Sequence, residues 1–313
     1  MAIAGHATTT ANLGANVLAA EYLQSTFQNE LFNNFVAYPL AEKAALPKGM
    51  GTTVTYNKIV KWTTALTANT EGDTGFPITL TSATVQATLL EYIAYGEYSE
   101  LLDLSAVTGT SERIAKNIGY VMATTVDTLI HTSALADATN TNDEGVAMTA
   151  EGLRKAAQEL ATLNVPHHSG TPGGAYYCSI LSPEQFYDMI GEGAPTWIQA
   201  MRAELTGALR TPWADQPSTS AVYDVMVKKS SNVVVSGGND VGYVFGDGAF
   251  FCASLGPDIA PESEGYRPRL IVTGPGEHVD QPGRNKGTAA GKMYYASEKL
   301  DINCIVKVLS DQS

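Results

Sequence analysis

The sequence offers few side chains at the spacings that catalysis or metal binding requires. Asp127 and His131 are four residues apart, which would place them on one face of a helix, but no third partner accompanies them. We therefore interpret His131 as a polar residue at a helix edge rather than as a general base. His167 and His168 are adjacent in a loop that contains Gly and Pro. Because neighbouring side chains diverge, we expect both to be solvated loop residues rather than metal ligands.

The glycine and cysteine patterns do not indicate an enzyme either. The stretch 236–250 is rich in glycine but lacks the Lys-Ser/Thr ending and the following helix of a phosphate-binding loop, so hairpin turns explain it better. The spacings GxSxG and HExxH and the EF-hand pattern are absent. Cys178, Cys252 and Cys304 lie far apart in apolar runs, which predicts three free, buried thiols that bind no metal. We expect no catalytic residue and no cofactor.

Composition narrows the range of partners. The chain has 313 residues, enough for one large or two ordinary domains, and a formal net charge of -13. An acidic chain is a poor candidate for gripping nucleic acid, which requires clustered Lys and Arg. The first ten residues resemble no signal peptide, and no apolar stretch reaches the roughly 20 residues of a membrane helix. These features, with the cysteines, predict a cytosolic product that does not bind membranes.

The strongest structural pattern is a long amphipathic helix between residues 111 and 137. It would span roughly 40 Å at 1.5 Å per residue. Gly119 lies inside it, either because the helix tolerates one glycine at about 1 kcal/mol or because a neighbouring backbone approaches closely; we favour the first interpretation. The apolar residues that recur every three or four positions are Ile114, Ile118, Val121, Met122, Val126, Leu129 and Ile130.

Before this helix the chain is predicted to be extended or arm-like. Residues 2–14 are small and polar and are expected to form an arm, followed by a helix over residues 17–36. Residues 53–62 and 84–95 alternate as two strands of a hairpin, joined by a polar tip of about 20 residues. An isolated two-stranded hairpin is marginally stable in water. It must therefore lie on the rest of its own chain or on another subunit.

After the long helix the pattern is that of mixed α/β structure. A turn is expected at 139–145, a helix capped by Thr149 and ended by Pro166, and a buried strand at 175–181. Ser182, Pro183 and Gln185 mark the start of a further short helix. Short strands are expected over 222–255, loops around 257–269 and 274–291, and two final strands over 292–310. The predicted fold class is α+β.

The order of these parts, together with two motifs, resembles the major capsid proteins of tailed bacteriophages. One motif, at the start of the hairpin, is Pro47, Lys48, Gly49 and Gly51. The second lies near the C-terminus, and there Gly291 stands where the family has an aromatic residue before the lysine. The residues at the positions of this motif are Asp280, Gly283, Arg284, Gly287, Gly291, Lys292, Ala296 and Leu300.

The resemblance implies an α+β capsid fold with an N-terminal arm, an extended hairpin loop, a long spine helix, a peripheral α/β platform and an axial domain. The implied boundaries are 1–50 for the arm and its helix, 51–100 for the hairpin, 101–191 with 287–313 for the peripheral domain, and 192–286 for the axial domain. The residues expected to make inter-subunit contacts, from the hairpin and from the second motif, are Trp62, Phe76, Asp280, Arg284 and Lys292.

The implied function is a structural shell subunit, not an enzyme. It would self-assemble through pentamers and hexamers into an icosahedral virion capsid in the host cytoplasm. It would enclose phage DNA without sequence-specific binding, with scaffold, portal and decoration proteins as further partners. Two alternatives stay open: the shell of a bacterial encapsulating compartment that holds a cargo enzyme, and an enzyme or adhesin whose site the sequence does not reveal.

Overall fold

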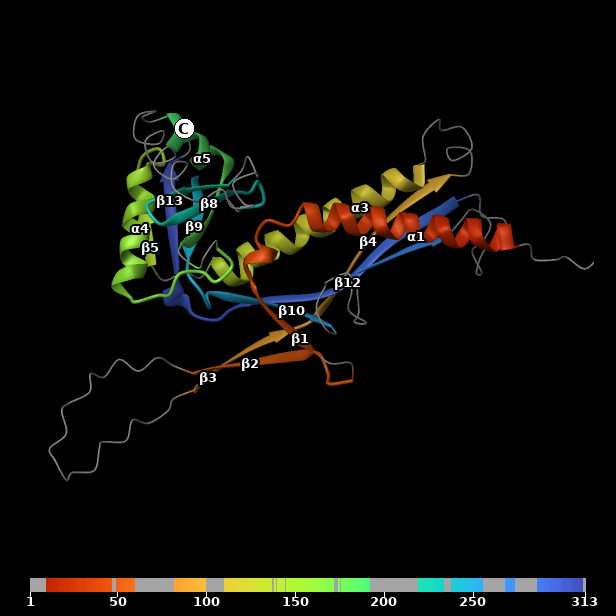
Figure 1. Cartoon of the computed structure of the whole chain (residues 1–313), viewed down its shortest axis with the longest axis horizontal. Helices are drawn as coiled ribbons and strands as arrows, with labels where there is room; N and C mark the ends of the chain where they lie inside the picture. Colours follow the sequence, from red (N-terminus) through yellow and green to blue (C-terminus); the bar gives the residue numbers. More distant parts are fainter. Residues whose placement is uncertain are drawn as a thin grey trace, which may run out of the picture.

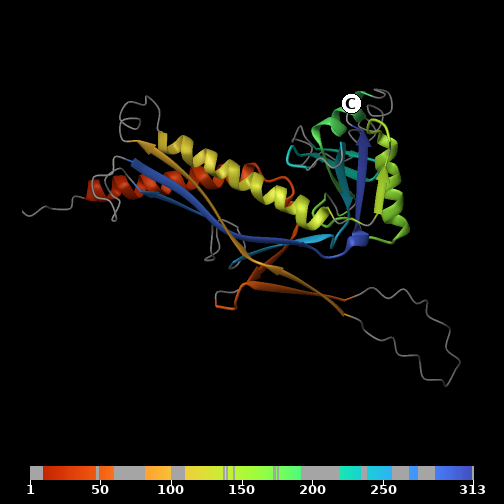
Figure 2. The same ribbon diagram turned by 180° about the vertical axis from the view of Figure 1, so that it is seen from behind.

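The molecule is elongated, with a compact lobe at one end and long helices and strands running away from it (Figures 1 and 2). The computed structural model describes residues 10–46, 49–59, 82–99, 110–136, 138, 140–143, 145–171, 174, 176–191, 219–233, 238–255, 268–273 and 286–311. For residues 10–21, 59, 190–191 and 219–222 only the backbone is described. Within these residues most strands occur in runs, β1–β4 over residues 42–99 and β7–β13 over residues 219–311, which confirms the predicted α+β class.

Two long helices form the upper layer of the extended part. Helix α1 (Thr10–Asn33) packs along α3 (Thr110–Leu129), and α3 continues as the π-helical turn η2 (Ile130–Leu135). The predicted arm is therefore helical from Thr10 onward, because extending an existing helix fixes only one residue for each new hydrogen bond. Most of the predicted apolar face of α3 is buried or packs against the core, but Val121 is 50% exposed and was assigned to the wrong face.

Gly119 allows α1 to approach α3 closely. A Cβ atom at this position would lie 2.8 Å from the backbone oxygen of Phe27 on α1. Real Cβ atoms essentially never approach another atom so closely, and a backbone oxygen in a packed helix cannot move aside. The favoured interpretation, a helix that merely tolerates a glycine, is therefore wrong, and the close-approach interpretation is confirmed.

The helices lie on one face of a five-stranded sheet. Its strand order is β1 (Glu42–Leu46), β10 (Phe250–Leu255), β12 (Lys286–Lys299) and β11 (Arg269–Thr273), and β4 (Leu90–Ser99) also pairs with β12. A Cβ atom at Gly291 of β12 would lie 2.5 Å from Cγ2 of Ile118 and 2.6 Å from Sδ of Met122. The two glycines thus set the spacing of three layers: α1 on α3, and α3 on β12. We call these helices and this sheet the five-stranded lobe.

The hairpin consists of β2 (Thr53–Ile59) and β3 (Ser82–Thr88) and projects below this sheet (Figures 1 and 2). The single strand predicted over 84–95 is in fact two strands, β3 and β4, separated at Leu89. Leu89 is buried in a small core under the hairpin, and from Leu90 onward the chain pairs with β12 of its own lobe. At the root of the hairpin, the ring of Tyr56 stacks on Phe251 with 5.5 Å between centroids.

The compact end contains a six-stranded mixed sheet, which with its helices we call the six-stranded lobe. Its order is β5 (Asn140–Asp143), β13 (Ile305–Asp311), β9 (Asn239–Phe245), β6 (Tyr177–Leu181), β8 (Val225–Lys229) and β7 (Thr219–Val222). The 3-10 turn η4 (Ile302–Cys304) joins β12 to β13, and the turn η1 (Tyr38–Leu40) follows α1. Residues 140–143 were predicted to be a turn, but they pair in parallel with β13; the neighbouring strand outweighs their polar composition.

Two helices accompany this sheet, and their starts follow the sequence. Helix α4 (Ala150–Thr162) begins at Thr149, whose Oγ1 accepts a hydrogen bond from the amide of Gly152 at 3.2 Å. Helix α5 (Pro183–Gly191) begins at Ser182, whose Oγ accepts from the amide of Gln185 at 3.1 Å. Both predicted N-caps are confirmed. No helix in the described part of the chain is both long and apolar enough to span a membrane.

Candidate functional site

Asp127 acts as a buried anchor between α3 and the chain that follows α1. Its carboxylate accepts hydrogen bonds from the backbone amides of Val36 at 2.9 Å, Ala37 at 3.2 Å and Tyr38 at 3.4 Å. Burial raises the pKa of this carboxyl group, and the three amides act in the opposite direction. The side chain therefore fixes η1 against the spine helix, which is a structural role.

His131 does not lie at a helix edge as predicted, because the π-helical end of the spine inserts it into the core. The residue is fully buried and its ring stacks on Tyr243 of β9 with 5.7 Å between centroids. Neither ring nitrogen has a hydrogen-bond partner among the described residues, so the pair with Asp127 suggested by the spacing does not form. Burial lowers the pKa of His131 to about 4, so the ring is neutral near pH 7.

The adjacent histidines diverge as expected, but only one is solvated. His167 is exposed, whereas His168 is buried and connects two segments. Nε2 of His168 lies 2.7 Å from the carbonyl oxygen of Leu40, and Nδ1 accepts a hydrogen bond from the amide of Gly170 at 3.0 Å. The expectation of a solvated loop residue is therefore wrong for His168, because Nε2 holds the loop against η1 and Nδ1 bonds within the loop.

The cysteines show no reactive environment. All three are buried, and burial raises the pKa of both Cys178 and Cys252 to about 12. The Sγ atom of Cys252 lies 2.8 Å from the hydroxyl of Tyr295. Over the described ranges no three His, Cys, Asp or Glu side chains gather closely enough to hold a metal ion. The predicted burial is confirmed.

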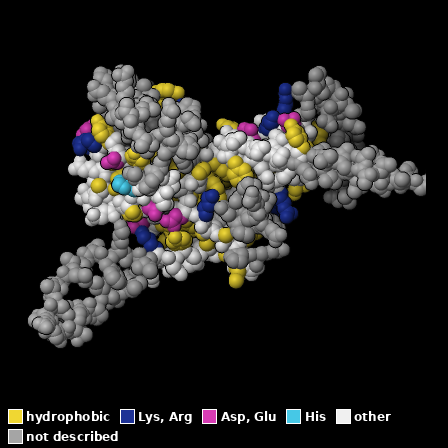
Figure 3. All heavy atoms as spheres, in the orientation of Figure 1, with side chains coloured by type: hydrophobic (Ala, Val, Ile, Leu, Met, Phe, Trp, Pro, Cys, Tyr) yellow, Lys and Arg dark blue, Asp and Glu magenta, His cyan; other side chains and the backbone are white. Residues whose placement is uncertain are grey.

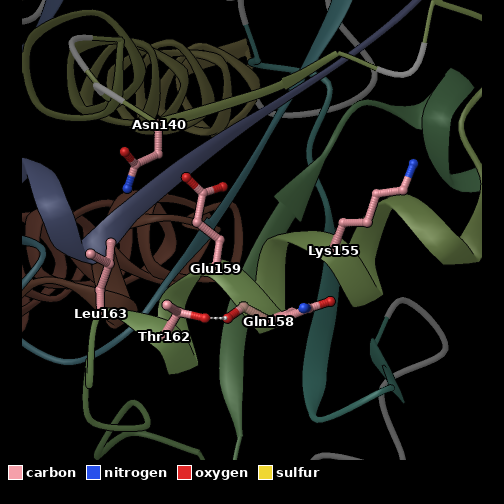
Figure 4. A pocket seen from close by; sticks show the side chains of 6 residues that line it. All are labelled: Asn140, Lys155, Gln158, Glu159, Thr162 and Leu163. Atoms are coloured by element: carbon pink, nitrogen blue, oxygen red, sulfur yellow. Dashed lines mark hydrogen bonds between the residues drawn. The ribbon is translucent and has the colours of Figure 1, made fainter.

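The surface of the six-stranded lobe contains a pocket of about 430 Å³ between β5 and α4 (Figure 4). Asn140 enters it from β5, and the remaining lining residues come from α4 and the residue that follows it. Nδ2 of Asn140 is buried without a hydrogen-bond partner among the described residues. Among the described lining residues the charged groups are Lys155 and Glu159, and the hydroxyl of Thr162 donates a hydrogen bond to the backbone oxygen of Gln158 at 2.8 Å.

Of the residues predicted to make inter-subunit contacts, only Lys292 lies within the described ranges. Trp62, Phe76, Asp280 and Arg284 lie outside them. The ammonium group of Lys292 pairs with Glu91 on the neighbouring strand β4 and lies 5.1 Å from the ring centroid of Tyr294. Lys292 thus lies on the face of the five-stranded sheet opposite the helices.

That face is open at one end, and the open part is an exposed surface that the sequence did not single out. Along β4, Tyr92 and Ala94 pack toward the core, whereas Ile93 and Tyr95 point away and are 57% and 70% exposed. Ile271 of β11 is also exposed. The alternation over 84–95 indicates which residues share a face, but only the tertiary structure shows which face the helices cover.

On the face shown in Figure 3 the described basic side chains are spread over both lobes rather than gathered in one patch. This distribution lacks the clustered Lys and Arg that tight phosphate binding requires.

The fold can be compared with that of known proteins. No family model matches the sequence, and no curated protein matches it. The capsid of Ralstonia phage GP4 is similar in structure with a TM-score of 0.65 and 13% identity, over 88% of this chain and 87% of that one. The capsid of Helicobacter pylori bacteriophage KHP30 is similar with a TM-score of 0.62 and 11% identity, over 90% and 91%.

An encapsulin shares the architecture less closely. The holo-SrpI encapsulin complex from Synechococcus elongatus PCC 7942 matches with a TM-score of 0.50 and 10% identity, over 86% of this chain and 84% of that one. In each of these comparisons nearly the whole of both chains is aligned, although few residues are identical. The chain therefore has the α+β fold of phage major capsid proteins, as its order of elements predicts.

Proposed function

We propose that this chain is the major capsid protein of a bacteriophage. Copies of it assemble through pentamers and hexamers into an icosahedral shell, in the cytoplasm of the host, and the shell encloses the phage DNA. The observation that carries the proposal is structural similarity along almost the entire chain to several phage capsid subunits. The net charge of -13 is consistent with a shell that encloses DNA without sequence-specific binding.

Expression of the full chain followed by negative-stain electron microscopy tests this function. We expect closed shells of uniform size, in which the 33.1 kDa chain is the main component. A stable monomer under all salt and concentration conditions would contradict the proposal. If shells form, scaffold, portal and decoration proteins can be sought in particles that are produced together with the neighbouring genes.

The encapsulating compartment is the second candidate, and the similarity to an encapsulin supports it. The contents of the particle distinguish the two. Particles isolated from their natural source should contain nuclease-protected DNA if the shell is a capsid, and a stoichiometric cargo protein if it is a compartment. The third candidate, an enzyme or adhesin, requires activity of a monomer that forms no particle.

Within this function we assign the hairpin an inter-subunit role. Its root is anchored on its own lobe through Tyr56, and Lys58 of β2 pairs with Asp301. Residues 60–81 continue from β2 to β3 and contain few bulky apolar groups, so they cannot form a core of their own. Because β4 belongs to the sheet of its own lobe, the proposed inter-subunit element is limited to 53–88 rather than 54–95.

The double variant Trp62→Ala, Phe76→Ala tests this role. Each aromatic side chain would lose about 150–250 Å² of buried surface, so we expect a folded subunit that forms far fewer shells. Tyr187→Ala, which removes an exposed aromatic ring of the six-stranded lobe, is the control and should assemble normally. Hydrogen exchange of residues 63–82 should slow on assembly; equal protection in the free subunit would mean that the hairpin packs on its own chain.

We also propose a division into domains that follows the two sheets. The six-stranded sheet contains β6 from before residue 192, β8 and β9 from the predicted axial segment, and β13 from the C-terminus. The six-stranded lobe is therefore our candidate for the axial domain, and the five-stranded lobe with the spine helix is our candidate for the peripheral domain. Limited proteolysis should release fragments that follow these lobes.

A further inference from the structure

The open end of the five-stranded sheet presents an ordered row of apolar side chains. The register places Tyr95 of β4 beside Ala290 of β12, and Ala290 beside Ile271 of β11. One row along, Ile93 is beside Lys292. Cross-strand neighbours are about 5 Å apart, so these side chains form one continuous surface. We call the surface formed by Ile93, Tyr95, Ala290 and Ile271, with the charged residues around it, the open sheet face.

The same side of the sheet is covered at its other end by the chain's own hairpin. There Val54, Tyr56 and Ala87 pack over Phe251 and Ala253 of β10. The hairpin runs away from the open sheet face, toward the six-stranded lobe (Figures 1 and 2). One side of a single sheet is thus sealed at one end and exposed at the other, which suggests that a further layer continues the cover.

The charges on the open sheet face are balanced. Lys286 pairs with Glu97 at 3.0 Å, and Lys292 pairs with Glu91, in both cases between β12 and β4. Each of these two lysines thus has an acidic partner, on a chain whose total charge is -13. Copies of an acidic chain repel one another on average. Charges paired in this way add little to the repulsion between copies, and they are less costly to remove from water than unpaired charges.

The size of the surface also suits an interface. Ten residues of β12 pair with β4 and five pair with β11. At about 3.3 Å per residue along a strand and about 4.8 Å between strands, these segments of the three strands cover roughly 400 Å² of sheet. That is about half of the roughly 800 Å² that each partner buries in a standard interface. The face could therefore form the centre of a contact, to which neighbouring elements add the rest.

We propose that the open sheet face is the docking surface for a second copy of this chain. This inference rests on the proposed function, because a head-to-tail contact between different surfaces generates closed rings when its rotation closes. The second copy places an uncharged surface on the row of Tyr95, Ala290 and Ile271. It thereby completes the cover that the chain's own hairpin begins.

Two matched pairs of variants test the surface. Ile93→Glu with Tyr95→Glu adds charge to the open sheet face, and Ile93→Thr with Tyr95→Thr removes apolar area while keeping residues that favour strands. The controls are Val146→Glu with Leu163→Glu, and Val146→Thr with Leu163→Thr, at exposed apolar positions of the six-stranded lobe. We expect both face variants to fold with an unchanged Tm. The Glu pair should lower shell yield at least tenfold and the Thr pair by a smaller factor, while the controls assemble like the natural chain.

Hydroxyl-radical labelling of Tyr95 provides an independent measurement on the natural chain. Its ring should react readily in the free subunit and be protected in the shell. A folded Thr pair that assembles at the natural rate would overturn the inference, as would equal reactivity of Tyr95 in both states or protection already in the free subunit. Failure of the natural chain to form any shell would instead contradict the proposed function, so the two failures are distinguishable.

Discussion

The two sheets of this chain are covered to different extents. In the six-stranded sheet, β6 is buried at every position, and β8 and β9 are buried at every position except one each. In the five-stranded sheet, β12 alternates between buried and partly exposed residues along its length, and on β4 nearly every second residue is exposed. Continuous burial indicates cover on both faces, and alternation indicates cover on one face only.

This difference separates two tasks within one subunit. The six-stranded lobe completes its core with its own helices and with the end of the spine helix, where His131 meets Tyr243. The five-stranded lobe uses α1 and α3 to cover one face and leaves part of the other face exposed. Mutations in a region that its own chain covers should lower the stability of the subunit. Mutations on an exposed face should leave the subunit folded and reduce shell assembly.

The strongest expected effect is on the covered face of the five-stranded lobe. Ile118→Asp places a charge in the packed layer between α3 and β12, where the side chain is only 5% exposed. An unpaired buried charge costs several kcal/mol, comparable with a total stability of about 5–15 kcal/mol. We expect no folded protein, as judged by circular dichroism and gel filtration.

The matched control is Val121→Asp, three residues further along the same helix and half exposed. It should fold with a nearly unchanged Tm. A native-like Ile118→Asp protein would show that the two faces of α3 are not distinguished by burial. Leu129→Asp, at a partly buried position that packs against the core, should be damaging but less so than Ile118→Asp.

The next effect concerns the interior of the six-stranded lobe and depends on pH. His131 has its pKa lowered to about 4 in the folded state. As the pH falls below about 6.5, the histidine of the unfolded chain takes up its proton before the buried one does. The contribution of neutral His131 to the free energy of unfolding is therefore fully present above about pH 6.5 and is lost toward pH 4. The loss should be about 3 kcal/mol. Urea unfolding across this range measures it.

His131→Phe should remove this part of the pH dependence, because the ring and its stacking are kept without the titratable group. His167→Gln, at an exposed position, should leave it unchanged. The raised pKa of Asp127 acts in the opposite sense, since the folded state holds that proton more tightly than the unfolded chain does. An unchanged pH slope in His131→Phe would refute the assignment of the loss to this ring.

A smaller effect is expected where the layers of the five-stranded lobe approach each other. Gly119→Ala should gain about 1 kcal/mol of helix propensity but lose about 1–3 kcal/mol through overpacking against the backbone of α1. The net result should be a lower Tm. Asn117→Ala, at an exposed position of the same helix, should be neutral or slightly stabilising. A Gly119→Ala variant more stable than the natural chain would contradict the inference that α1 approaches α3 closely at this position.

The mildest effect is on assembly rather than on folding. Every copy carries -13, and charges more than about 10 Å apart are screened near 0.1 M salt. Shell formation should therefore strengthen as salt rises to moderate levels, which light scattering can follow. Assembly that weakens steadily with salt would indicate that ion pairs between subunits dominate over the apolar contacts proposed for the open sheet face.

The sequence by itself determined the local features of the chain. Thr149 and Ser182 were recognised as helix starts because a cap acts on amides two or three residues away. The spine helix and its buried positions Ile118, Met122 and Val126 followed from a period of 3.6 residues. The order of the elements was sufficient to identify the fold, because it does not depend on the exact bounds of any one element.

The tertiary structure decided what depends on neighbours distant in sequence. Residues 140–143 become a strand because β13 lies beside them, and Leu89 divides two strands because a small core forms under the hairpin. His131 is buried because the end of the spine helix meets β9, and Gly119 is needed because α1 crosses at that point. Periodicity shows which residues share a face, but the element that covers the face comes from elsewhere in the chain or, as we propose for the open sheet face, from another copy.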